Sequence, residues 1–460
     1  MNANSKPSSN FLSIKSNWLL LLVCLSGIMV ITLASSVDFF CIPKQSRVFN
    51  VSNEELFLFY SVVYSLINIY VLKVSLSLKN PKFKMGTISF VTILTIQLII
   101  ISMVLAIYGQ IKVSYLYYNV IFYALIYLSL ASSTAFLAIA AMQFFRWFLR
   151  VKNYLVMTYA LVMIVLCTNS IIGIIYLSQI SLSHAKTIKY MSCSVMISSL
   201  NTPNPKITNF LVSLYDITSF FSFIFAWLVT VSMLKEYSKN KNRLLYWFIF
   251  SLPLIFFLPR YEIALYYFSS HQVNTILTSI NFSSEIFGYQ ALNTILNLNL
   301  QLGGAFFGMA FLTIAAKLTR GTKQRNSLIL TGIGLMFLFA SKDISSLIIS
   351  SYPPLGAVSI AFLGIASYMV YVGIYNTAAL AARDKKLRKE LSEKIQNNMK
   401  LLRSIASSED RLQIEKNVKH LMTLSTELQE ENEQQDLTQS EIRDIVNDVI
   451  LELKKKKMTS

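Results

Sequence analysis

The chain has 460 residues, of which 54% are hydrophobic and only 14% are charged. A water-soluble protein carries about a quarter charged residues, so this composition indicates a chain that is solvated largely by lipid. The formal net charge of +18 comes from basic residues in short runs between apolar stretches. Such runs are typical of membrane loops rather than of a nucleic-acid-binding surface, and we expect no nucleic-acid partner.

A helical membrane span needs about 20 mostly apolar residues, and ten apolar segments are candidates. The segments are 18–37, 56–77, 87–108, 116–142, 153–177, 209–234, 244–259, 297–317, 327–349 and 354–378. They predict an all-α fold, a polytopic transmembrane helix bundle over residues 18–378 that follows a cytoplasmic N-terminus at 1–17. The seventh segment is short and contains Pro253, and no element is predicted within 259–296.

The first segment also has the outline of a signal peptide. Lys6 and Lys15 precede it, and Ala34 and Ser36 fit a signal-peptidase site. Its apolar run is longer than a usual signal core, and no globular domain follows it. We therefore expect a retained span, and cleavage would leave the other nine spans in the same orientation.

The orientation of the spans follows from Lys and Arg, which gather in cytoplasmic loops. Alternate loops are basic, namely 79–84, 146–152, 235–243 and 319–325, and the other loops hold most of the sparse acidic residues of the membrane part. The basic loops must share one side, and an even number of spans places both termini there. We expect a multi-pass protein of the cell membrane with both termini in the cytoplasm.

The cysteines do not form a disulfide scaffold. Cys24 and Cys167 lie inside apolar segments, where we expect core residues. Cys41 and Cys193 lie in loops that the orientation places outside, where an oxidising environment permits a disulfide between them. Two unpaired thiols on separate loops are the alternative.

Small residues let helix backbones approach one another closely in lipid. Gly304 and Gly308 form a GxxxG pattern in the eighth span, and Gly356 and Gly364 are small notches in the tenth. We expect packing within the bundle at these faces, with dimerisation as the alternative.

Ionisable side chains within membrane spans are costly and tend to be functional. Asp216, Arg260, Glu262, Lys342 and Asp343 lie at similar depth near the outer face. One interpretation is a ligand-binding pocket that opens outwards. The other is one or two structural ion pairs, and Asp216 with Lys342 is the pair that we expect.

Several kinds of site have no motif in this sequence. There is no P-loop, no HExxH and no Cys/His spacing for a metal, so we expect no cofactor and no metal site. No acid lies near the middle of a predicted span, which argues against an ion-coupled transporter. Asp38 closely follows the first span, as an acid does in polytopic glycosyltransferases that use lipid-linked sugars. Such an enzyme would place its catalytic acids around Asp38, Glu54 and Glu55.

The composition changes after about residue 379. Apolar residues recur at spacings of three and four from Leu387 to Ile405, which predicts an amphipathic juxtamembrane helix over 379–406. Further helices are predicted within a cytoplasmic tail at 407–460. An apolar stripe must be buried against something, so the tail either folds on itself or pairs with a second copy as a coiled coil.

The last span runs into the juxtamembrane helix without interruption, because no Pro or Gly follows Gly373. An unbroken helix can transmit a shift or rotation that a Gly- or Pro-rich linker would absorb. The basic residues of this passage are expected at the inner membrane surface. They are Arg383, Lys385, Lys386, Arg388 and Lys389.

Residues 352–388 read YPPLGAVSIAFLGIASYMVYVGIYNTAALAARDKKLR. Tyr352-Pro353-Pro354, Gly356, Gly364, Ser367-Tyr368, Gly373-Ile374-Tyr375, Asp384 and Leu387-Arg388 stand out in this stretch. On these residues it resembles the last span and juxtamembrane helix of uncharacterised polytopic proteins from ammonia-oxidising archaea, which look like sensory membrane modules. The resemblance covers under a tenth of the chain. It implies an archaeal cell membrane, but no ligand and no activity.

Together these features favour a multi-pass sensor or signal-relay protein that passes an outer stimulus through its last span to the helical tail. The expected partners are the lipid bilayer and a cytoplasmic protein or a second copy of the chain. A small-solute transporter with a regulatory tail is the first alternative, and it would need a polar path from Asp216 and Lys342 towards the cytoplasm. The glycosyltransferase-like membrane enzyme is the third interpretation, and otherwise we expect no enzymatic activity.

Overall fold

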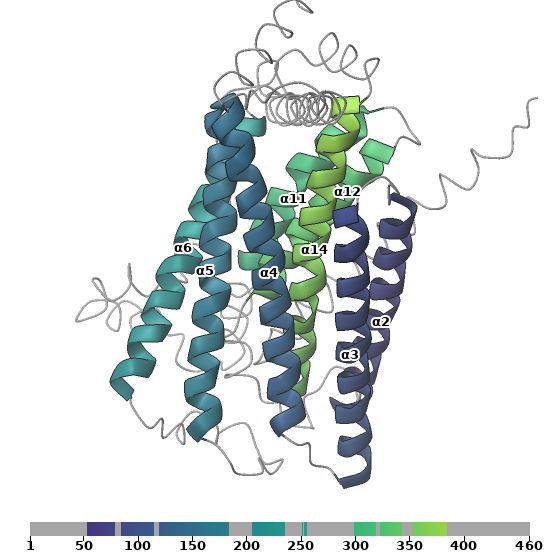
Figure 1. Cartoon of the computed structure of the whole chain (residues 1–460). Coiled ribbons are helices and arrows are strands. Elements are labelled where there is room, and N and C mark those ends of the chain that lie inside the picture. Colours follow the sequence, from purple (N-terminus) through teal and green to yellow (C-terminus); the bar gives the residue numbers. More distant parts are fainter. Residues whose placement is uncertain are drawn as a thin grey trace, which may run out of the picture.

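The structure is a computed structural model that describes residues 53–78, 84–114, 119–183, 205–234, 251, 253–254, 299–318, 323–342 and 353–383. These residues form eight long helices and contain no strand (Figure 1). The helices are α2 (Asn53–Leu78), α3 (Lys84–Ser114), α4 (Asn119–Val151), α5 (Tyr154–Ser183), α6 (Pro205–Leu234), α11 (Asn299–Lys317), α12 (Lys323–Ser341) and α14 (Pro353–Arg383). The all-helical prediction is confirmed for this part of the chain.

Six of these helices, α2 to α6 and α14, contain a segment long and apolar enough to cross a membrane. α11 contains a shorter apolar segment, Gly303–Ala316. The predicted ninth span is described only as far as Lys342, just beyond the end of α12. The predicted span 18–37, nearly all of 244–259, and the tail beyond Arg383 lie outside the described residues.

α4 and α5 are joined by a two-residue corner. α4 ends where Lys152 takes a left-handed backbone with φ of 50°, a conformation that closes helices. The Lys152 N–H still donates to the Phe148 carbonyl over 2.7 Å. Asn153 then caps α5, because its side-chain oxygen accepts the Leu155 N–H over 3.0 Å. The corner therefore turns the chain back on itself without leaving these groups unbonded.

α14 occupies the centre of the bundle (Figure 1). It packs against α2, α3, α4 and α12. The apolar segment of α14 is 100% buried, whereas each of the other five candidate spans has half or less of its own apolar segment buried. α4 runs parallel to α14, since Ser129 contacts Ile360 and Ser133 contacts Ser367. The last described helix in chain order is thus the innermost one.

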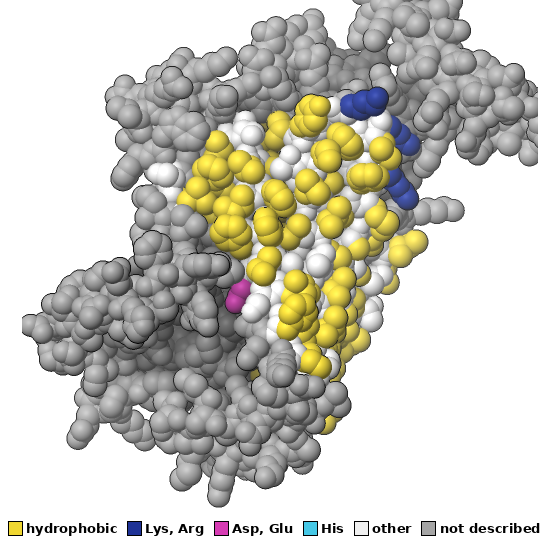
Figure 2. All heavy atoms as spheres, turned by 90° about the vertical axis from the view of Figure 1, so that its left-hand side faces the viewer, with side chains coloured by type: hydrophobic (Ala, Val, Ile, Leu, Met, Phe, Trp, Pro, Cys, Tyr) yellow, Lys and Arg dark blue, Asp and Glu magenta, His cyan; other side chains and the backbone are white. Residues whose placement is uncertain are grey.

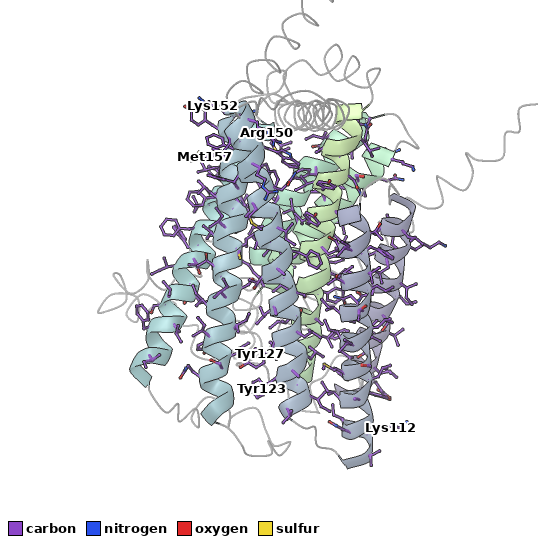
Figure 3. The ribbon with its side chains drawn as sticks, in the orientation of Figure 1. Lys112, Tyr123, Tyr127, Arg150, Lys152 and Met157 are labelled. Carbon is purple, nitrogen blue, oxygen red and sulfur yellow. The ribbon has the colours of Figure 1, made fainter. Side chains whose placement is uncertain are left out.

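Basic residues gather at one end of the bundle. Figure 3 shows Arg150 and Lys152 where α4 meets α5, and Lys112 at the opposite end. Because α14 is parallel to α4, Arg383 lies at the same end as Arg150. Close contacts show that α12 is antiparallel to α14, so Lys323 also lies there. We refer to this end as the basic end.

The bundle carries apolar side chains on its outside, and inside it polar side chains are buried among apolar ones. Figure 2 shows hydrophobic side chains over most of the described surface on the face that it presents, with Lys and Arg at one end. On α2, Phe59, Leu66 and Ile69 are exposed while Tyr64 and Asn68 are fully buried. So many exposed large apolar side chains are unlike the surface of a water-soluble protein and indicate contact with a lipid bilayer.

Candidate functional site

Lys342 follows α12 directly and lies in the interior, with only 4% of its surface exposed. Its Nζ donates to Ser222 Oγ over 2.7 Å and to the Ser219 carbonyl over 3.4 Å, both on α6. The same nitrogen lies 4.9 Å from the ring centroid of Phe339, within range of a cation–π interaction. A hydroxyl, a carbonyl and an aromatic face therefore take the place of water around this amine.

The amine lies deeper than the sequence predicts. Ser222 is the tenth residue of the 22-residue candidate span Ser213–Leu234. At 1.5 Å per residue it is about 14 Å from the end of that span that faces away from the basic end. The Lys342 side chain thus extends towards the middle of α6 rather than staying near an outer face. A charged group at this depth is costly and is by default a functional candidate.

A second set of hydrogen bonds holds the backbone of Lys342. The Tyr215 hydroxyl of α6 donates to the Lys342 carbonyl oxygen. Asn169 of α5 in turn donates to the Tyr215 carbonyl over 3.0 Å. These contacts tie α5, α6 and the end of α12 together, and they fix the Lys342 backbone separately from its amine. We refer to Lys342, Ser219, Ser222, Tyr215 and Asn169 as the Lys342 site.

Three phenylalanines from α6, α11 and α12 pack beside this site. The ring centroids of Phe307 and Phe339 are 4.7 Å apart, and those of Phe223 and Phe307 are 5.0 Å apart. Gly303 allows this packing, because a Cβ at that position would lie 2.2 Å from the Phe223 ring. The amine therefore sits beside an apolar wall, where electrostatic interactions are stronger than in water.

Of the other predicted site residues, the structure describes Asp216 and Arg383. Asp216 is exposed on α6, one helical turn from Ser219, and lies within electrostatic range of Tyr176 on α5. Its ion pair with Lys342 stays a prediction. Arg383 is the last residue of α14. Outside the described residues lie Arg260, Glu262, Asp343, Cys41, Cys193, Lys385, Lys386, Arg388 and Lys389.

A second polar group lies along α14, and no pattern in the sequence pointed to it, because its members are uncharged serine and tyrosine side chains. Ser129 Oγ of α4 donates to an α14 carbonyl over 2.6 Å. Ser133 Oγ lies 2.6 Å from Ser367 Oγ, and Ser75 Oγ of α2 lies 2.6 Å from the Tyr368 hydroxyl. We refer to these contacts as the α14 seam. On the sides of α14 that face α2 and α4, the packing thus includes hydrogen bonds made by serine and tyrosine hydroxyls as well as apolar contacts.

A third group joins α2 to α3 beside the α14 seam. The Tyr64 hydroxyl of α2 lies 2.5 Å from Gln97 Oε1 of α3 and 3.3 Å from the Ala361 carbonyl of α14. The signal for this group was present in the sequence. Tyr60, Tyr64 and Asn68 recur every fourth residue, which places them on one face of a helix.

The glycines of the eighth span pack within the bundle, as predicted. A Cβ on Gly308 would lie 2.3 Å from the Gly332 carbonyl oxygen of α12, and one on Gly304 would lie 2.8 Å from the Met336 carbonyl oxygen. α11 and α12 therefore approach to backbone contact, which only the absence of a side chain allows.

Within the described ranges, no group of three or more His, Cys, Asp or Glu side chains is arranged to hold a metal ion. Comparisons with models of protein families, with curated proteins and with solved structures find no match to this chain. The resemblance of residues 352–388 to archaeal membrane proteins therefore stays a prediction. A functional interpretation depends on the Lys342 site, the α14 seam and the position of α14.

Proposed function

We propose that this chain is a multi-pass membrane sensor or signal-relay protein in which α14 passes a change from the bundle to the cytoplasmic tail. The position of α14 supports this best. The helix contacts four others, is buried over its whole apolar segment, and ends at the basic end. A closely packed interior transmits displacement, so a neighbour that moves would move α14 with it.

The Lys342 site is the input that we propose. It connects α5 and α6 to the end of α12, and α12 packs along α14. The α12–α14 contact is close, because a Cβ on Gly334 would lie 2.8 Å from Met369 Cβ. A ligand or a field that changes how Lys342 is held would shift α12, and α12 would shift α14.

The proposal includes ten spans with the basic end in the cytoplasm. Helix contacts show that α6 ends at the basic end and that α11 begins at the opposite end, which supports a further span between them. In this arrangement Cys41 and Cys193 lie outside the cell, where a disulfide between them is permitted. Arg383 and the basic residues after it lie at the inner membrane surface.

Alanine substitutions at three glycines test the relay. Gly373→Ala would place a Cβ 2.7 Å from the Ser327 carbonyl of α12, and Gly334→Ala would place one 2.9 Å from the Val370 nitrogen of α14. Both changes force α14 and α12 apart. Gly308→Ala is the matched control, because its Cβ would meet an α12 backbone oxygen at 2.3 Å but would separate only α11 from α12.

Hydrogen exchange over residues 384–460, followed by mass spectrometry on protein in nanodiscs, gives the readout. We expect Gly373→Ala and Gly334→Ala to change exchange in the tail more than Gly308→Ala does, because Gly308 can act on α14 only through α12. A tail that responds equally to all three variants, or to none, would contradict a specific connection through α14.

A small-solute permease with a regulatory tail is the second candidate, and the α14 seam favours it. Hydroxyl groups lie along α14 within the membrane part, as the walls of a polar path do. The seam faces α2 and α4, whereas the Lys342 site contacts α5 and α6, so the path would differ from the one predicted from Asp216 and Lys342. A permease would show solute flux in proteoliposomes that Ser133→Leu and Ser129→Leu lower.

A further inference from the structure

Two neighbouring carbonyl groups of α14 accept hydrogen bonds from outside the helix. Ser129 Oγ of α4 lies 2.6 Å from the Ile360 carbonyl oxygen and 3.4 Å from that of Ala361. The Tyr64 hydroxyl of α2 lies 3.3 Å from the same Ala361 oxygen. Within an α-helix, each of these oxygens also accepts the N–H group four residues later. Two successive backbone hydrogen bonds of α14 therefore share their acceptors with side chains of neighbouring helices.

The amides that share these acceptors belong to Gly364 and Ile365. Gly364 is the ninth residue of the 23-residue candidate span of α14, and glycine weakens a helix in which it is an interior residue. A Cβ on Gly364 would lie 2.3 Å from Ser132 Oγ and 3.5 Å from the Ser129 carbonyl oxygen. Two oxygen atoms of α4 thus lie close to the Gly364 backbone, where they can accept its N–H if the helix opens.

The Tyr64 hydroxyl has one hydrogen and two acceptors within reach. It lies 2.5 Å from Gln97 Oε1 of α3 and 3.3 Å from the Ala361 carbonyl oxygen of α14. Gln97 Nε2 is fully buried and has no hydrogen-bond partner in the described part of the chain. An unbonded buried donor costs its desolvation, which lowers the preference for this arrangement over one in which Tyr64 bonds to α14. The contact between α2, α3 and α14 can therefore adopt two arrangements.

We propose that α14 carries a hinge at Gly364 and alternates between a straight and a bent form. In the bent form, the amides of Gly364 and of the residue after it leave their carbonyl acceptors, which stay bonded to the Ser129 and Tyr64 hydroxyls. Within a bilayer, a helix can open only where neighbouring groups replace the lost backbone bonds. Kinks form where a side chain enters the backbone hydrogen-bond ladder of a helix. α14 meets both conditions at Gly364.

The hinge divides α14 into an outer segment, 353–363, and an inner segment, 365–383. The inner segment packs closely against α12, since a Cβ on Gly334 would lie 2.8 Å from Met369 Cβ. A movement of α12 can then turn the inner segment further than the outer one. The part of the hinge in signalling rests on the proposed relay, whereas the bending depends only on the contacts around Gly364.

Spin-label distances on the full chain in nanodiscs, in a background without the native cysteines, test the hinge. The inner pair, Asn376→Cys with Tyr154→Cys, joins α14 to the exposed first residue of α5. Asn376 is about 18 Å beyond the hinge along the helix axis, so bending displaces it strongly. The outer pair, Pro354→Cys with Val113→Cys, joins the start of α14 to the exposed end of α3. We expect two distances for the inner pair and one narrow distance for the outer pair.

Ser129→Ala should shift the inner pair towards one distance, because the bent form loses the donor that replaces a backbone bond. Thr134→Ala is the matched control on α4, since its hydroxyl bonds to a carbonyl of its own helix over 2.8 Å. Gly364→Ala is made in a Ser132→Ala background, which gives the new methyl group room. Compared with Ser132→Ala alone, it should lower the population of the second distance about fivefold, as the helix propensities of glycine and alanine require.

One narrow distance for both pairs in the unmodified protein would overturn the hinge. An inner pair that neither Ser129→Ala nor Gly364→Ala changes would overturn it as well. If the two pairs change together, α14 moves as a rigid body and the proposal is wrong. An inner pair that shifts to one distance while hydrogen exchange in the tail stays unchanged would support the hinge and count against the relay.

Discussion

Replacing Ser222 by alanine tests whether its hydroxyl solvates the Lys342 amine. The hydroxyl accepts from Lys342 Nζ over 2.7 Å and donates to the Ser219 carbonyl over 2.7 Å. Both bonds are buried, and the first one involves a charged donor. A hydrogen bond to a charged group contributes about 1.5–3 kcal/mol, and the loss falls at the upper end when the charge stays buried.

We therefore expect Ser222→Ala to lower the free energy of unfolding by about 1.5–3 kcal/mol. For a chain of this size this corresponds to a thermal midpoint lower by about 2–6 °C, measured by intrinsic fluorescence in nanodiscs. Ser170→Ala is the matched control. Ser170 is also buried, but its hydroxyl bonds only to the Leu166 carbonyl of its own helix. The control should change the midpoint by less than about 1 °C.

A double-mutant cycle shows whether the stability lost in Ser222→Ala comes from the hydrogen bond to the Lys342 amine. In a Lys342→Met background the charged donor is gone, so Ser222→Ala should cost less than about 0.5 kcal/mol. The coupling energy would then be about 1–2.5 kcal/mol. An equal cost of Ser222→Ala in both backgrounds would show that the hydroxyl acts only within α6, and the description of Lys342 as solvated by α6 would be refuted.

Two further predictions concern packing. Gly308→Ala should lower the unfolding midpoint by several degrees, because its Cβ would meet the Gly332 carbonyl oxygen at 2.3 Å. Gly109→Ala should leave the midpoint unchanged or raise it, because nothing lies within 4 Å of its Cβ. In a background without the native cysteines, Ser133→Cys with Ser367→Cys should form a disulfide on mild oxidation, seen as a gel shift that dithiothreitol reverses, since the two Oγ atoms are 2.6 Å apart. A pair that stays reduced would contradict the parallel packing of α4 and α14.

The existence of the described helices followed from apolar runs, but their ends did not. The sequence predicted a span over 116–142, and α4 extends to Val151. Hydropathy falls at Gln143 and Arg146, yet both residues have good helix propensity, so the chain stays helical until Lys152 turns left-handed. Hydropathy measures how far the apolar segment extends, but it does not show where the helix that contains the segment ends.

The Lys342 site was predictable in part. A lysine in an apolar stretch was enough to single out Lys342, because its charge is unusual there. Its partners Ser219 and Ser222 are uncharged, and serines are common in membrane helices, so nothing in a single sequence distinguishes them. Tyr60, Tyr64 and Asn68 recur every fourth residue, so the sequence places them on one face of α2. The spacing does not say whether that face meets lipid or protein. That choice depends on α14, which lies some 300 residues further along the chain.

The order of synthesis has a consequence for how the bundle is assembled. α14 is made after α2, α3 and α4, yet it lies at the centre between them. Until α14 arrives, the hydroxyls of Ser129 and Ser133 have no α14 groups to bond, and a carbonyl of α4 itself is the acceptor left to them. The earlier helices therefore cannot form their final contacts before α14 has been made. A chain that ends before Pro353 therefore lacks the helix around which α2, α3 and α4 pack, and the loss falls at the centre of the bundle rather than at its edge.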